Sequence, residues 1–224
     1  MLININPLSI THFLRFRKKK IIGSNDDFEL SSRRYNGNRF ADLIVEDIAI
    51  KTGKALKQCP HIRATLQRFQ DKLDWRETEY IQLYETWYRK IDNKIYKERS
   101  FEDFYEHRLK TWDSIFNDIK SEGYKASSNP KANVEIAINE YGQPLLIDGR
   151  HRVAFALILR LREIPVTVNI ISENLARSFT NANFANSFAD KNIARAFETN
   201  SSRLSEQLRQ DDIKSRLITA CQDQ

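Results

Sequence analysis

The spacing of the apolar residues changes near residue 130, and this change limits the fold more than any other feature of the chain. Between Ile62 and Ile119 the apolar residues recur every three or four positions, the spacing of one face of an α-helix. From Val134 to Ile138 they alternate along the chain, as in a β-strand. The sequence therefore predicts an α+β fold, in which a small mixed β-sheet is packed by N-terminal and C-terminal helices.

Four helices are expected before the sheet. One spans Asp42 to Lys57 and ends before Pro60, and the next runs from Pro60 to Leu73. Residues 75–95 carry rings and apolar side chains at helical spacing, which favours core packing; an aromatic platform that stacks nucleic-acid bases is the alternative. Ser100 is a candidate N-cap for a fourth helix, which ends at Gly123.

The next segment predicts a β-hairpin that leads into a helix. A turn over residues 139–144 separates the first strand from a second one at 145–147. The run Asp148-Gly149-Arg150-His151-Arg152 follows at once, before an apolar helix over 153–162 and a strand over 164–168. These five residues should lie at a helix N-terminus, where free N–H groups and the helix dipole favour an anion.

Each residue of this run suits a phosphate site. Gly149 lets the backbone approach a ligand, Arg150 and Arg152 can bind phosphate oxygens, and His151 can donate a hydrogen bond or move a proton. Asp148 suits a Mg²⁺ ligand or a general base. The alternative is structural, with Asp148 capping the helix and the basic residues forming local salt bridges.

The stretch VEIAINEYGQPLLIDGRHRVAFALILRLREIPVTV resembles the core of the ParB/sulfiredoxin superfamily, also known for its ParB-like nuclease domain, over roughly residues 101–171. The closest motif is the D-G-x-H-R of free-serine kinases. The resemblance implies nucleotide binding, with ATP or CTP, at Asp148, Gly149, His151 and Arg152. Sulfiredoxins carry a catalytic cysteine where this chain has Arg150, so sulfinic-acid reduction is not expected.

Two other features of the family bear on the expected function. ParB proteins follow this core with a helix-turn-helix domain that the residues after Ile171 do not show, and the catalytic glutamate of the serine kinases has only positional candidates, Glu106, Glu122 and Glu135. The pattern Trp75-x-x-Thr78-x-Tyr80 is similar to uncharacterised bacterial and archaeal proteins with a helical segment before a ParB-like core. That similarity extends the match back to about Asp74 and favours one integrated domain.

The net charge of +6 resides in the N-terminal third, where a basic run could contact nucleic acid, anionic lipid or an acidic partner, or could be a solvated arm. That run comprises Arg15, Arg17, Lys18, Lys19 and Lys20. Apolar residues precede it, the reverse of a secretory signal, and no apolar stretch is long enough for a transmembrane segment, so a cytoplasmic protein is expected. Cys59 and Cys221 lie far apart, which favours reduced thiols.

These observations predict a basic irregular arm over residues 1–40, a helical layer plus the core over 41–171, and a C-terminal helical extension over 172–224. The expected function is a Mg²⁺-dependent NTPase or a phosphotransferase (kinase) acting on an unknown small acceptor, with Asp148 as metal ligand and Asp148 and His151 as catalytic residues. One alternative is a DNA-binding or DNA-processing protein, whose salt-sensitive binding needs residues 1–20. Another is a non-catalytic interaction module that assembles, for instance as a homo-oligomer, through its C-terminal helices.

Overall fold

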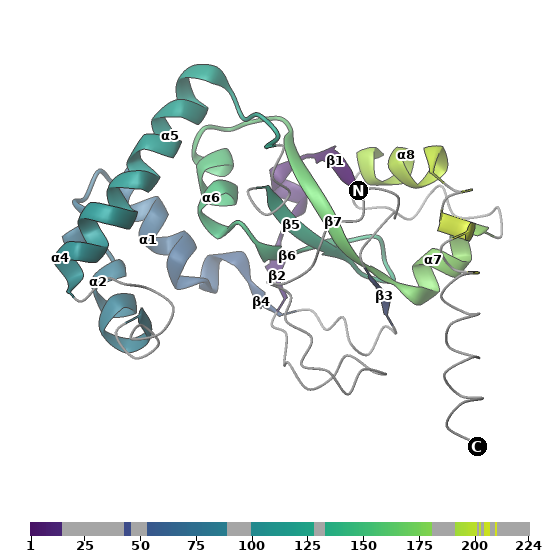
Figure 1. The fold of residues 1–224 in the computed structure, drawn as a ribbon, viewed down its shortest axis with the longest axis horizontal. Coiled ribbons are helices and arrows are strands. Elements are labelled where there is room, and N and C mark those ends of the chain that lie inside the picture. Colours follow the sequence, from purple (N-terminus) through teal and green to yellow (C-terminus); the bar gives the residue numbers. More distant parts are fainter. Residues whose placement is uncertain are drawn as a thin grey trace, which may run out of the picture.

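A mixed sheet lies at the centre of the molecule, with a layer of helices beyond one end and two further helices beyond the other (Figure 1). The computed structural model describes residues 1–14, 43–45, 53–88, 100–127, 133–180 and 191–200, together with 202, 204–206 and 209. Within these residues, the expected combination of helices with a mixed sheet is confirmed. None of the described helices is both long and apolar enough to cross a membrane.

The described part of the sheet has seven strands. They are β1 (Leu2–Ile5), β2 (His12–Phe13), β3 (Leu43–Val45), β4 (Lys54–Ala55), β5 (Val134–Ile138), β6 (Pro144–Asp148) and β7 (Ile164–Ser172). Their order is β1-β7-β5-β6-β2-β4, and β3 also pairs with β7. β5 and β6 form the predicted antiparallel hairpin, whereas β7 runs parallel to β5 and β2 runs parallel to β6.

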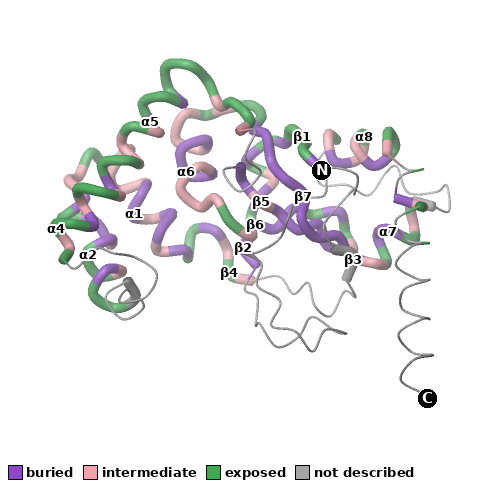
Figure 2. The backbone as a smooth tube through the Cα atoms, in the orientation of Figure 1, coloured by how far each residue is buried: buried purple, intermediate pink, exposed green. Residues whose placement is uncertain are grey.

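The centre of the sheet is buried on both faces. All nine residues of β7 are buried, and Figure 2 shows this strand as a continuous buried segment. On one face, β5 and β7 pack against Val153 and Ala154 of helix α6 (Arg150–Ile158), and on the other face Ala137 packs with Leu145 and Ile170. The apolar run after His151 is therefore a helix that covers the sheet, as its composition predicts.

The helical layer consists of α1 (Pro60–Phe69), a 3-10 turn (Trp75–Glu77), α2 (Tyr80–Leu83), a π-helical turn (Tyr84–Tyr88), α4 (Phe101–Phe104), a second π-helical turn (Tyr105–Leu109) and α5 (Lys110–Glu122). Ser100 caps α4 as predicted, because its hydroxyl accepts a hydrogen bond from the Asp103 N–H at 3.1 Å. Gly123 ends α5 with a φ of 79°. Phe116 and Ile119 of α5 pack on Phe155 of α6 and thus join this layer to the sheet.

The sequence predicts an irregular arm over residues 1–40 that contains at most short elements. The described residues 1–14 contain two short strands, β1 and β2, which pair with β7 and β6. One sequence prediction near the N-terminus is wrong. A helix was expected over residues 42–57, but residues 43–45 and 54–55 are strands. Ile44 and Val45 are β-branched, and β7 offers them a parallel partner, so long-range pairing overrides the local helical spacing. Residues 56 and 57 belong to a 3-10 helix (Leu56–Gln58). The basic run over residues 15–20, and residues 42 and 46–52 of that predicted helix, lie outside the described residues.

Beyond β7 the chain forms α7 (Glu173–Thr180) and α8 (Lys191–Thr199), which confirms helices in the C-terminal region. They contribute buried apolar side chains to the core of the sheet, among them Leu175, Ile193 and Phe197. These helices therefore complete the packing of the sheet. Residues 181–190 between them, and Cys221, lie outside the description, while Cys59 is a buried free thiol.

Candidate functional site

The five-residue run lies where the sequence places it, at the junction of β6 and α6. Gly149 is the N-cap of α6 and has a φ of 90° and a ψ of 28°, a left-handed conformation that favours glycine. A Cβ atom at this position would lie 2.9 Å from the Cα of Val134, so there is no room for one. The exposed Asp148 accepts a hydrogen bond from the Gly149 N–H through Oδ1 at 2.7 Å.

The two arginines of the run have no acidic partner in the described part of the chain. Arg150 and Arg152 are half-buried, and neither appears in an ion pair there. The Arg150 Nε atom is buried and without a hydrogen-bond partner. Two guanidinium groups in the first turn of a helix oppose the positive end of its dipole, and a buried N–H without a partner adds a desolvation cost. The local salt bridges of the structural alternative are therefore not formed among these residues.

His151 points into the helical layer. Its Nε2 atom hydrogen-bonds with the hydroxyl of Tyr80, and its ring stacks on Trp112 with the centroids 4.1 Å apart. The ring of His61 lies edge-on at 5.9 Å. Burial, together with the nearby His61 and Arg152, holds the pKa of His151 well below its usual 6.5. The imidazole is therefore neutral at pH 7, and a role in binding phosphate or in catalysis stays a prediction.

A second buried histidine lies behind the run. His61, on α1, is 6% exposed, and burial together with the charge of Arg150 lowers its pKa to about 4. Tyr124 lies near Arg152, with its hydroxyl oxygen buried and without a hydrogen-bond partner. Burial raises the pKa of Tyr124 to about 12, so the hydroxyl keeps its proton. The described side chains around the junction are thus positively charged or neutral, apart from Asp148 and its register partner Glu135.

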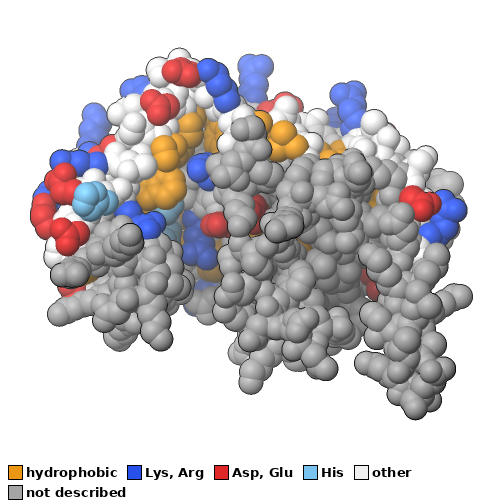
Figure 3. All heavy atoms as spheres, in the orientation of Figure 1, with side chains coloured by type: hydrophobic (Ala, Val, Ile, Leu, Met, Phe, Trp, Pro, Cys, Tyr) orange, Lys and Arg blue, Asp and Glu red, His pale blue; other side chains and the backbone are white. Residues whose placement is uncertain are grey.

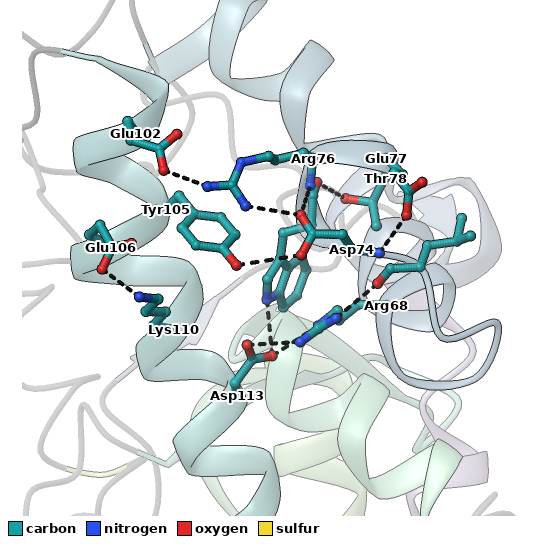
Figure 4. Close-up of polar contacts among 12 residues, drawn as sticks. Arg68, Asp74, Arg76, Glu77, Thr78, Glu102, Tyr105, Glu106, Lys110 and Asp113 are labelled. Atoms are coloured by element: carbon teal, nitrogen blue, oxygen red, sulfur yellow. Dashed lines mark hydrogen bonds and ion pairs between the residues drawn. The ribbon is translucent and has the colours of Figure 1, made fainter.

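Residues that hold the helical layer in place form the polar network of Figure 4. Asp113 of α5 accepts hydrogen bonds from Arg68 of α1 at 3.1 Å through each of its oxygens, and its Oδ1 also accepts one from the Trp75 indole at 3.0 Å. Nearby, Asp74 accepts hydrogen bonds from the Arg76 N–H at 3.0 Å and from the Tyr105 hydroxyl at 3.4 Å. Sequence reasoning missed this network, since Asp113 occupies an ordinary polar position of its helix.

Of the three glutamates considered as a catalytic base, one lies close to the run. Glu106 pairs with Lys110 at 2.6 Å and Glu122 with Lys125 at 2.8 Å, both in exposed positions of the helical layer and its C-terminal end. Glu135 of β5 lies opposite Asp148 in the strand register and accepts a hydrogen bond from Asn169 at 2.7 Å. Glu135 is therefore the glutamate that the fold places beside the junction.

The described carboxylates at the junction are too few to bind a metal ion by themselves. Within the described residues, no group of three His, Cys, Asp or Glu side chains is arranged to bind a metal ion. Mg²⁺ commonly takes one or two carboxylates and completes its shell with water and phosphate oxygens. The exposed carboxylate of Asp148 fits such a site only when phosphates supply further ligands.

Figure 3 shows basic, acidic and histidine side chains gathered in a hollow between the helical layer, at the left of that view, and the centre of the molecule.

Comparisons of the chain with protein-family models, with curated proteins and with solved structures found no match.

Proposed function

We propose that the protein binds a nucleoside triphosphate with its phosphates at the N-terminus of α6. The observation that carries this proposal is the pair Arg150 and Arg152, which lie without acidic partners in the described part of the chain at the positive end of a helix, with one N–H buried and unsatisfied. A phosphate group would supply the missing negative charge and the missing acceptor. The D-G-x-H-R resemblance favours a nucleotide, ATP or CTP, over other anions.

The first turn of α6 provides the remaining contacts. Its free backbone N–H groups point out of the helix end. The missing side chain of Gly149 lets the start of this helix pack closely on Val134 of β5. Such a site would position the phosphates and neutralise their charge. In phosphoryl transfer, positioning and charge neutralisation supply most of the catalysis. That the sheet and α6 form a ParB/sulfiredoxin-like core is part of the same proposal. The fold class alone does not select a function, because one fold is compatible with several functions.

The proposed reaction is Mg²⁺-dependent hydrolysis of the nucleotide or transfer of its γ-phosphate to a small acceptor. When bound, Mg²⁺ would neutralise phosphate charge. Asp148 would hold the metal through the carboxylate oxygen that Gly149 leaves available, or would accept the proton of the attacking group. Glu135, held by Asn169, is the second carboxylate near enough in the sheet register to serve as that base.

Thermal unfolding with ATP, CTP, GTP and ADP, each with and without Mg²⁺, tests this function. A nucleotide at about 100 times its dissociation constant should stabilise the protein by about 2.7 kcal/mol. We expect Arg152→Ala to abolish the shift, whereas Arg162→Ala, an exposed arginine beyond the other end of α6, should retain it. If Arg152→Ala binds nucleotide like the wild type, or if no nucleotide stabilises the wild type, the proposal is wrong.

A further inference from the structure

We infer that Tyr80 is a positioning residue of this site: its hydroxyl donates a hydrogen bond to Nε2 of His151 and thereby places the ring proton on Nδ1, where it can be donated to bound phosphates. The inference rests on the proposed function, because it assigns the direction of the His151 donor in the phosphate site. It also gives a role to the Trp75-x-x-Thr78-x-Tyr80 pattern, which the phosphate contacts alone leave unexplained.

The pattern builds a rigid support for the Tyr80 ring. The side chains of Trp75, Thr78 and Tyr80 are all buried, with Trp75 and Tyr80 fully so. The Thr78 hydroxyl donates to the Trp75 carbonyl at 2.8 Å and accepts from the Tyr80 N–H at 3.2 Å, which fixes the start of α2. The Tyr80 ring then packs edge-on against Trp75, with the centroids 5.1 Å apart. Asp113 anchors the indole of Trp75 in turn.

The ring of His151 is confined from three sides. Trp112 stacks on it at 4.1 Å and 21° between planes, Tyr80 lies nearly parallel to it at 5.6 Å, and His61 meets it edge-on. These rings come from α5, α2 and α1, so three helices of the helical layer hold the imidazole. A ring confined in this way keeps the directions of its two nitrogen atoms.

The partners of the ring decide which nitrogen carries the proton. The charged and titratable groups around it are His61, Arg150, Arg152 and the hydroxyl of Tyr80. Burial, together with His61 and Arg152, lowers the pKa of His151 and keeps the ring neutral, with one donor and one acceptor nitrogen. A phenol is a better donor than a neutral imidazole, so the Tyr80 hydroxyl donates and Nε2 accepts. The proton then resides on Nδ1, the nitrogen nearest the backbone of the first turn of α6.

Nitrogen NMR of the full-length protein tests this assignment without any ligand. In uniformly ¹⁵N-labelled wild type, His151 should show a protonated Nδ1 and an unprotonated Nε2, with the signals assigned by their loss in His151→Gln. Tyr80→Phe should convert them to a mixture of both tautomers. The matched control is Tyr84→Phe, one turn further along, whose ring contacts Phe101 and Phe104 and should leave the signals unchanged. A protonated Nε2 in the wild type, or an unchanged spectrum in Tyr80→Phe, would overturn the inference.

Calorimetric titration with ATP and Mg²⁺ separates the inference from the proposed function. We expect Tyr80→Phe to weaken binding a few-fold, because bound phosphates must then select the Nδ1-protonated tautomer from the mixture, whereas Tyr84→Phe should bind like the wild type. Wild-type affinity in Tyr80→Phe would overturn the inference and leave the nucleotide site standing. Absence of binding in the wild type would overturn the proposed function, while the tautomer spectrum would still decide whether Tyr80 sets the proton on His151.

Discussion

The two histidines at the junction have lowered pKa values because they are buried next to arginines. His61 and His151 lie beside Arg150 and Arg152, and the fold keeps both imidazoles neutral. In the unfolded chain a histidine gains a proton below about pH 6.5, whereas folded His61 gains one only near pH 4. Between these values the unfolded state binds more protons, so the free energy of unfolding falls as the pH falls.

The first prediction concerns this pH dependence. On acidification from pH 7 to 4, His61 should cost the folded protein about 3 kcal/mol, and His151 should act in the same direction. His61→Phe, which retains an aromatic ring against Tyr80, should show a smaller loss than the wild type. Urea unfolding at pH 7 and pH 4 measures the loss of stability, with His107→Gln, a substitution of an exposed histidine, as the control. Equal losses in His61→Phe and the wild type would contradict the assignment.

Between elements, one carboxylate joins three segments of the helical layer. Asp113 on α5 binds Arg68 on α1 and the indole of Trp75 in the 3-10 turn. The Arg68 and Asp113 side chains are 27% and 24% exposed, so water screens this pair only in part. The network holds the 3-10 turn that precedes α2, and Trp75 of this turn packs against Tyr80, so the packing of the layer is linked to the orientation of His151.

Asp113→Asn tests this link. The amide keeps the shape but loses the charge and one acceptor, so we expect a loss of about 2 kcal/mol in the free energy of unfolding. The control is Glu106→Gln, which removes an exposed i,i+4 pair with Lys110 and should cost about 0.5 kcal/mol or less. Urea midpoints of the two variants give the comparison, and equal stabilities would show that the Asp113 network does not hold the layer.

In the whole molecule, the N-terminal residues are part of the sheet. β1 pairs with the first half of β7, and Ile5 is fully buried in the core with Ile164 as its register partner. The Met1 carbonyl accepts a hydrogen bond from the Val168 N–H at 2.8 Å. Deleting residues 1–20 would therefore remove β1 and β2 from the sheet. A test of the DNA-binding alternative should instead neutralise Arg15, Arg17, Lys18, Lys19 and Lys20 by substitution.

Ile5→Ala should show how much the first strand contributes. We expect a loss of about 3 kcal/mol in the free energy of unfolding, because a buried side chain is replaced by a cavity. Leu8→Ala removes a leucine that is 71% exposed and should change stability by less than about 0.5 kcal/mol. Circular dichroism during urea unfolding measures both variants. A wild-type midpoint for Ile5→Ala would mean that β1 is not needed for the core.

The sequence alone predicted the elements whose pattern is local. The hairpin is predicted by the alternation in residues 134–138 and the turn after Asn139. A helical segment begins after Ser100 and ends at Gly123, as their capping chemistry predicts. The run from Asp148 to Arg152 lies at the predicted helix N-terminus. Each of these signals depends on neighbours within a few residues, so periodicity and capping chemistry are enough to find them.

Tertiary structure decided the rest, because hydrogen bonding between strands and contacts between side chains join residues that are far apart in the sequence. Residues 43–45 are a strand only because β7 offers them a parallel partner, and residues 2–5 pair with residues 164–167. The spacing of Tyr80 and Trp112 predicts that both lie on helices, and they do. Their meeting at His151 depends on how the helical layer packs on α6, which no local pattern records.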